Sequence, residues 1–324
     1  MSRSRKSLVA TATIRICGTL AFSFVAVLTI TLESSIEVAA ESPGDIPITP
    51  IGPPPAADPR KLTLGERLFH DPRLSGHRDR ACSSCHDVRA NGADAARYTV
   101  DRDGAELTFN TSTVFNAALN FRLGWKGKFR SLEAEAAAQF ELDGIMRTTV
   151  AEVLGRLSDD AAISGQFREA YGYGPDRASL VDAITTYERS LVTPGSRFDR
   201  WLGGDAAALS DEEMRGYHLF KSLGCVSCHQ GVNIGGNLLE RQGIFRPLTS
   251  PNPGVLRVPS LRNVATTAPY FHDGSAPTLE DAVRRMAAAQ LNQTLSEPEI
   301  EAVVAFLQTL TGNYRGDPVT AKSR

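Results

Sequence analysis

The feature that most restricts what this 324-residue chain can fold into is the pattern Cys-x-x-Cys-His, which occurs twice. Two thiols three positions apart on a helical turn reach the two vinyl groups of one porphyrin, and the next residue then places an imidazole under the iron. The pattern therefore predicts two covalently bound haem c groups. The predicted attachment residues are Cys82, Cys85, Cys225 and Cys228, and the predicted iron ligands are His86 and His229.

Three other uses of paired cysteines fit this chain less well. A zinc ribbon needs its second pair ~15–20 residues after the first, whereas Cys85 and Cys225 lie in different halves of the chain. A redox dithiol of the thioredoxin kind needs a βαβ setting, and no such alternation is visible. Structural disulfides are typical of exported proteins, but they do not explain a His directly after each pair.

The first forty residues have the layout of a secretory signal. A basic head is followed by the uncharged apolar run Ile16–Leu32 and by small residues before a predicted cleavage point after Ala40. The run is at the lower edge of the length that spans a membrane, so an uncleaved anchor is the alternative. Both interpretations place the rest of the chain outside the cytoplasm, and we expect a periplasmic protein.

The remaining sequence predicts a mainly α fold with two cytochrome c-like domains, each carrying one haem. After the signal (1–40) we expect a proline-rich linker (41–61), an N-terminal haem domain (62–196), a C-terminal cytochrome c domain (197–315) and a short tail (316–324). Helix starts are indicated by Ser210, Thr278 and Ser296, each followed three residues later by an acidic residue. The formal net charge of −2 excludes a basic footprint for nucleic acid.

The sixth ligand of each iron decides whether it transfers electrons or binds small molecules. Met286 follows His229 at about the separation at which a Met closes the iron in small cytochrome domains. For the first haem no His occurs in residues 87–109, and we favour an open iron. Met146 lies at a similar distance after His86 and remains an alternative ligand, while His70 and His77 precede the motif.

Several further segments are similar to those of the bacterial di-haem cytochrome c peroxidases. The similarity is carried by Leu64–Ser75, by Pro259–Ala265 with Pro269–Gly274, and by Ala305–Gly312, and it extends over about residues 62–313. The methylamine-utilisation di-haem enzyme, which oxidises tryptophans of a partner protein, belongs to the same superfamily. That enzyme has a Tyr at the second haem, so Met286 favours the peroxidase branch.

The resemblance implies roles for the two haems and for several residues. The N-terminal haem would react with hydrogen peroxide, and the C-terminal haem would take electrons from a small donor, either a cytochrome c or a cupredoxin. Trp125 matches the Trp between the haems, and Asn110, Thr267 and Pro269 match positions that line a calcium site between the domains. Family members often form homodimers.

Two departures from the family pattern qualify this expectation. The loop after the first motif has no His, so the first haem is expected to be accessible without reductive activation. The family's distal Gln and Glu fall on Glu135 and Ile145, and Ile145 cannot move a proton between the peroxide oxygens. Glu135 is therefore our catalytic candidate, with Glu141 and Asp143 as substitutes.

Three functions remain open from the sequence. The leading hypothesis is a periplasmic di-haem peroxidase. The second is a non-enzymatic electron-transfer cytochrome in which Met146 closes the first iron. The third is an enzyme that oxidises a partner protein, which is motivated by the missing acid at Ile145.

Overall fold

The computed structural model describes residues 47–101, 103–141 and 145–322, so the predicted signal and Asp143 lie outside the described residues. The described residues all belong to one compact unit. The described part is largely helical with two short two-stranded ribbons, which confirms the predicted fold class. No helix within these described ranges is long and apolar enough to cross a membrane.

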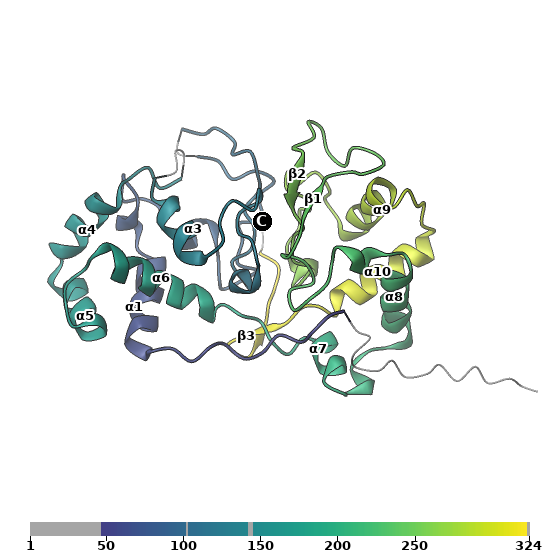
Figure 1. Cartoon of the computed structure of the whole chain (residues 1–324), viewed down its shortest axis with the longest axis horizontal. Helices are drawn as coiled ribbons and strands as arrows, with labels where there is room; N and C mark the ends of the chain where they lie inside the picture. Colours follow the sequence, from purple (N-terminus) through teal and green to yellow (C-terminus); the bar gives the residue numbers. More distant parts are fainter. Residues whose placement is uncertain (1–46, 102, 142–144, 323–324) are drawn as a thin grey trace, which may run out of the picture. The chain divides into compact units, whose positions relative to one another are not determined.

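The helices fall into two groups along the chain, one around each Cys-x-x-Cys-His motif (Figure 1). The first group contains α1 (Pro59–Phe69), α2 (Cys82–Cys85), α3 (Leu132–Gln139), α4 (Val150–Ser158), α5 (Ala161–Tyr171) and α6 (Arg177–Ser190). The second group contains α7 (Arg197–Leu202), α8 (Asp211–Ser222), α9 (Leu279–Gln290) and α10 (Glu297–Gln308). We call the two groups the first and second haem regions.

Shorter elements connect these helices. The 3₁₀ turns are Pro72–Leu74, Ala117–Leu119, Ala206–Ala208, Cys225–Ser227 and Val264–Thr266. Strand β1 (Leu239–Arg241) pairs antiparallel with β2 (Val255–Arg257), so that Glu240 lies opposite Leu256. Strand β3 (Asn313–Tyr314) pairs with β4 (Asp317–Pro318) in the same sense.

The helices that the sequence predicted begin at residues whose side chains cap the first turn. The Ser210 hydroxyl accepts a hydrogen bond from the amide of Glu213 at 3.3 Å, and the Glu213 carboxylate accepts one from the amide of Ser210 at 2.9 Å. Thr278 caps α9 by accepting from the amide of Asp281 at 3.2 Å. Each cap satisfies backbone donors that have no partner within the helix.

Each haem region is built on one close helix crossing. Helix α1 packs against α6 in the first region, and α8 packs against α10 in the second (Figure 1). A Cβ atom at Gly65 would collide with the carbonyl oxygen of Ala183, and one at Gly216 would collide with that of Ala302. Glycine is therefore required at both crossings, because only hydrogen lets the two backbones approach so closely.

Residues 47–51 of the proline-rich segment pack on the second region, although the sequence predicted an unpacked spacer there, whereas residues 52–57 are exposed, as expected of a spacer. Ile48 and Ile51 are buried, with only 2% and 6% of their surfaces exposed. Ile48 joins the core formed around Phe198, Tyr217 and Phe306. The carbonyl of Pro47 also accepts a hydrogen bond of 2.7 Å from the amide of Gly231, just after the second motif.

Residues 314–322, near the C-terminus, pack on the first haem region. Val319 and Tyr314 contact a core that includes Phe69, Phe115 and Tyr187. An ion pair of 3.6 Å joins Lys322 to Asp87, next to the first motif. Each haem region is therefore completed by a segment from the far end of the chain, as the purple and yellow segments of Figure 1 show.

Candidate haem sites

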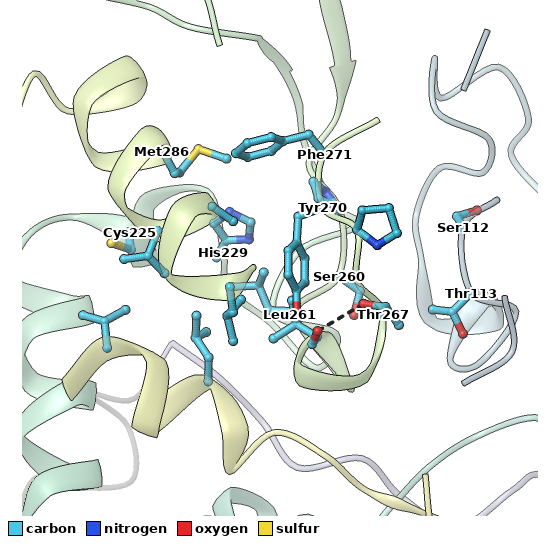
Figure 2. A pocket seen from close by; sticks show the side chains of 18 of the residues that line it. Ser112, Thr113, Cys225, His229, Ser260, Leu261, Thr267, Tyr270, Phe271 and Met286 are labelled. Atoms are coloured by element: carbon cyan, nitrogen blue, oxygen red, sulfur yellow. Dashed lines mark hydrogen bonds between the residues drawn. The ribbon is translucent and has the colours of Figure 1, made fainter. Parts of the chain in front are cut away.

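The second Cys-x-x-Cys-His motif borders an apolar cavity of about 200 Å³. Cys225, His229 and Met286 all line it, and Figure 2 shows Phe271 beside the Met286 side chain. Much of the remaining wall is hydrophobic and includes Phe220, Leu223, Leu261, Val264, Leu279, Val283, Val303 and Leu307. Helix α9 supplies Met286, and the turn after α8 supplies Cys225.

The two motif histidines are held in the same way. The Nδ1 atom of His229 lies 3.3 Å from the carbonyl oxygen of Ile234, and that of His86 lies 3.2 Å from the carbonyl oxygen of Gly92. A proton on Nδ1 satisfies this contact and leaves Nε2 free to bind a metal. Burial lowers the pKa of both imidazoles, that of His229 to about 4. Neutral rings are the form that binds iron.

No disulfide joins the four motif cysteines, so all four remain available for haem attachment. Burial raises the pKa of Cys82 to about 12 and that of Cys225 to about 11. An apolar cavity lined by a thiol and an imidazole from one motif, and by the thioether of Met286 from α9, suits a c-type haem with His and Met as axial ligands. The residues of the second site therefore fit this group.

Met146, the alternative ligand for the first iron, lies in a helix core. Its surface is 5% exposed, and it packs in a cluster with Leu68, Phe140 and Val153. Ile145 packs against the same cluster. His70 and His77 are both exposed at the surface. This packing argues against the hypothesis of a non-enzymatic cytochrome in which Met146 is the sixth ligand of the first iron.

Two glutamates lie close to one another on helices α3 and α6 of the first region. Burial raises the pKa of Glu135, and the guanidinium of Arg257 opposes that rise. Burial together with the nearby Glu135 raises the pKa of Glu188 to about 8. Glu188 in turn helps to raise the pKa of the Cys82 thiol, which places it beside the first motif. Glu141, by contrast, is exposed.

Sequence reasoning singled out Glu135 but missed Glu188 and Arg257. Glu188 lies next to the buried Tyr187 in α6, and neighbouring residues of a helix point in different directions, so the local sequence does not mark Glu188 as buried. Arg257 is 6% exposed and donates from Nε to the carbonyl of Gly124 at 3.2 Å. The only available signal was its position just before the Pro259–Ala265 segment.

Trp125 and Asn110 connect the two haem regions. The indole Nε1 of Trp125 donates to the carbonyl of Asn110 at 2.9 Å, and the amide of Asn110 donates to the carbonyl of His272 at 2.8 Å. The side-chain nitrogen of Asn110 donates to the carbonyl of Pro269 at 3.3 Å. Trp125, Asn110, Thr267 and Pro269 all line the cavity of the second site. The structure thus brings the three predicted calcium residues together.

The side-chain oxygen of Asn110 is buried and has no hydrogen-bond partner among the described residues. A buried acceptor without a partner is costly unless a cation or a water satisfies it. Amide and backbone carbonyl oxygens are ligands that calcium accepts. The residues therefore fit a calcium ion, although no cluster of three or more acidic, His or Cys side chains suited to a metal occurs in the described ranges.

Comparisons with known proteins agree with this arrangement. A family model described as di-haem cytochrome c peroxidase matches residues 59–207, and a cytochrome c model matches residues 213–311. Cytochrome c551 peroxidase of Nitrosomonas europaea is 36% identical over 311 residues, covering 89% of this chain and 91% of that protein. Methylamine utilization protein MauG of Methylorubrum extorquens is 30% identical, covering 78% of each chain.

A solved structure is also similar. A MauG-like protein associated with microbial copper homeostasis superposes with a TM-score of 0.71 at 27% identity, covering 81% of this chain and 93% of that chain. Two helical haem regions with these matches define an oxidoreductase that uses two c-type haems. The chain belongs to the di-haem cytochrome c peroxidase family, which confirms the resemblance found in its sequence.

Proposed function

We propose that this protein is a cytochrome c peroxidase, which reduces hydrogen peroxide at the first haem site with electrons from a small donor protein. The observation that carries the proposal is the placement of His229 and Met286 in one apolar cavity, since that ligand pair suits an electron-transfer iron. The burial of Met146 in a helix core supports an open iron at the first site.

The haems are proposed to be attached through Cys82 and Cys85 at the first site and through Cys225 and Cys228 at the second. His86 and His229 would bind the irons, and Met286 would be the second ligand at the second site. When bound, the haems supply the electrons that reduce peroxide. Each hydrogen peroxide takes up two electrons and two protons to form two waters, so the protein must pass protons from solvent to the peroxide oxygens.

Glu135 is the side chain we assign to this proton transfer. It is partly buried, and the loss of solvent raises its pKa and so favours the neutral, proton-carrying form, whereas Ile145 carries no proton. Helix α3 holds Glu135 so that its Oε1 atom would lie 3.8 Å from a Cβ at Gly124, next to Trp125. A positioned acid of this kind contributes about 10²–10⁴-fold to a reaction rate.

The remaining assignments follow the site. We propose that Trp125 assists electron passage between the regions, and that calcium binds Asn110, Thr267 and Pro269, where the unpartnered oxygen of Asn110 supports it. The donor would be a cytochrome c or a cupredoxin, and we propose a homodimer as in the family. Export to the periplasm is supported by the signal layout and by the use of covalent haem.

The test mixes the holoprotein, both resting and half-reduced, with hydrogen peroxide in a stopped-flow instrument. Glu135→Gln should slow the reaction by about 10²-fold. Glu141→Gln, which changes an exposed carboxylate nearby, should leave the rate unchanged. Two low-spin irons that fail to react with peroxide in either state would refute the peroxidase assignment.

Oxidation of a partner protein is the second candidate, and the packing of Ile145 against the helix core favours it. The core contact leaves the family's acid position without a proton carrier. Rapid peroxide turnover with a small cytochrome donor, in the absence of any oxidised protein product, would exclude this alternative.

A further inference from the structure

Most of the large apolar side chains exposed in the described part lie in two segments of the chain. Of the seven large hydrophobic residues exposed in the described part, five lie in residues 121–130 or in the hairpin that contains β1 and β2. They are Phe121 (62% exposed), Leu239 (40%), Ile244 (57%), Phe245 (58%) and Val255 (52%). We call this surface, formed by residues 121–130 and 239–257, the hairpin face. Such concentrations on a soluble protein usually mark an interaction site.

The two segments of the hairpin face are tied to one another. The amide of Arg257 donates to the carbonyl of Trp125 at 2.8 Å, and the side chain of Leu239 lies against Gly127. The hairpin tip is fixed to the helix that carries Met286, since the amide of Phe245 donates to the carbonyl of Ala289 at 2.9 Å. These hydrogen bonds and contacts fix the two segments of the hairpin face to one another and fix the hairpin tip to α9.

The charge of the hairpin face is opposite in sign to that of the whole chain. Its basic side chains are Arg122, Lys126, Lys128, Arg130, Arg241 and Arg246, together with the buried Arg257, and Glu240 is its one acidic residue. None of the first six forms an ion pair with a carboxylate of the described residues. Lys128 instead lies 5.2 Å from the ring centre of Phe129, and Arg122 lies 5.7 Å from that of Phe121.

The hairpin face covers the second haem site. Trp125, Gln242 and Arg257 belong to its two segments and also line the cavity that contains His229 and Met286. Glu240 acts electrostatically on the Cys228 thiol, so β1 passes close to the attachment point of the second haem. A protein bound here would approach the site at which electrons are proposed to enter.

We propose that the hairpin face is the docking site for the electron donor, and that this donor carries acidic residues around an apolar centre. The inference rests on the proposed function. An apolar centre with a charged rim is the usual anatomy of a protein interface, and opposite charges raise the rate of encounter. A second copy of this chain is a poorer occupant, because a two-fold interface would bring the same basic surfaces together.

The test uses one donor in two charge states. A mitochondrial cytochrome c is strongly basic, and succinylation of its lysines makes the same fold acidic. Steady-state kcat/KM of the holoprotein with each reduced donor is measured over a range of ionic strength. The double variant Lys128→Glu/Arg241→Glu is compared with Arg168→Glu/Arg177→Glu, which makes the same charge change at exposed positions of α5 and α6.

The succinylated donor should be the better substrate at low ionic strength, and added salt should reduce its advantage. The hairpin double variant should lower kcat/KM for that donor by about tenfold, whereas the control double variant should change it little. Equal effects of the two double variants, or a preference of the unmodified protein for the basic donor, would overturn the proposal. A loss of dimer in the hairpin variant would assign the face to a second copy instead.

Failure of the proposed function would be recognised separately. In that case the unmodified protein, reduced chemically without any donor, would not react with hydrogen peroxide. A normal reaction with peroxide combined with no dependence on hairpin charge would refute the docking site alone.

Discussion

The buried ion pair between Arg262 and Asp199 holds four separate segments around the second haem site. The guanidinium nitrogen and carboxylate oxygen are 2.7 Å apart, and the side chains are 1% and 5% exposed. Arg262 also donates to the carbonyl of Val232 at 3.0 Å and to that of Thr49 at 2.9 Å. The carboxylate of Asp199 accepts from the amide of Ile51 at 3.3 Å.

Replacing Arg262 by Met should therefore be severely destabilising. It leaves the Asp199 carboxylate buried without a counter-ion and removes the donors to Val232 and Thr49. Breaking a buried pair from one side costs about 3–5 kcal/mol, which is a large part of the ~5–15 kcal/mol that stabilises an ordinary protein. Adding Asp199→Asn removes the unpaired charge and should restore about 1–3 kcal/mol of that loss.

The measurement is urea unfolding of the holoprotein and its variants, followed by far-ultraviolet circular dichroism and by haem absorbance. The free energies of unfolding come from linear extrapolation, and the double-mutant cycle gives the coupling between the two residues. A loss below about 1 kcal/mol for Arg262→Met, or strictly additive effects of the two substitutions, would show that the pair does not hold these segments as argued.

The other predictions concern individual side chains. Gly216→Ala should lower the free energy of unfolding by about 1–3 kcal/mol in urea, because the new methyl meets the backbone of α10. Gly155→Ala, which has open space in α4, should instead raise it by roughly 0.5–1 kcal/mol. Because the pKa of Glu188 is raised to about 8 from 4.5, the folded protein binds a proton that the unfolded chain releases. The free energy of unfolding should therefore fall as the pH rises between these two values, by up to about 1.4 kcal/mol per pH unit. Glu188→Gln should make this fall smaller. Met286→Ala should abolish the weak far-red absorption of a Met-ligated ferric haem, and an unchanged band would remove Met286 as ligand.

Helix starts were predictable because capping depends on residues within one turn of each other. Ser210 and Thr278 cap α8 and α9, two of the helices that the sequence indicated. The mainly helical class followed from the same local patterns. The short strands β1 and β2 were not predicted, since three residues are too few to show an alternating pattern.

The candidate site was predictable where its functional groups belong to residues that form a local sequence pattern. The motif histidines needed only their adjacent cysteines, and Met286 needed only its spacing from His229. Glu188 and Arg257 acquire their surroundings from other parts of the chain, so no local pattern marks them. The burial of Ile48 was hidden in the same way, because nearby prolines indicated an extended spacer while its partners lie beyond residue 197.

Each haem region is completed by a segment from the far end of the chain, and this has a consequence for thermal unfolding. Residues 47–51 complete the second region, and residues 314–319 complete the first. Neither region is one continuous stretch of sequence, so a fragment cut near residue 196 would lack part of its own core. Heating should accordingly give a single cooperative calorimetric transition for both halves, since loosening either one releases a segment that the other requires.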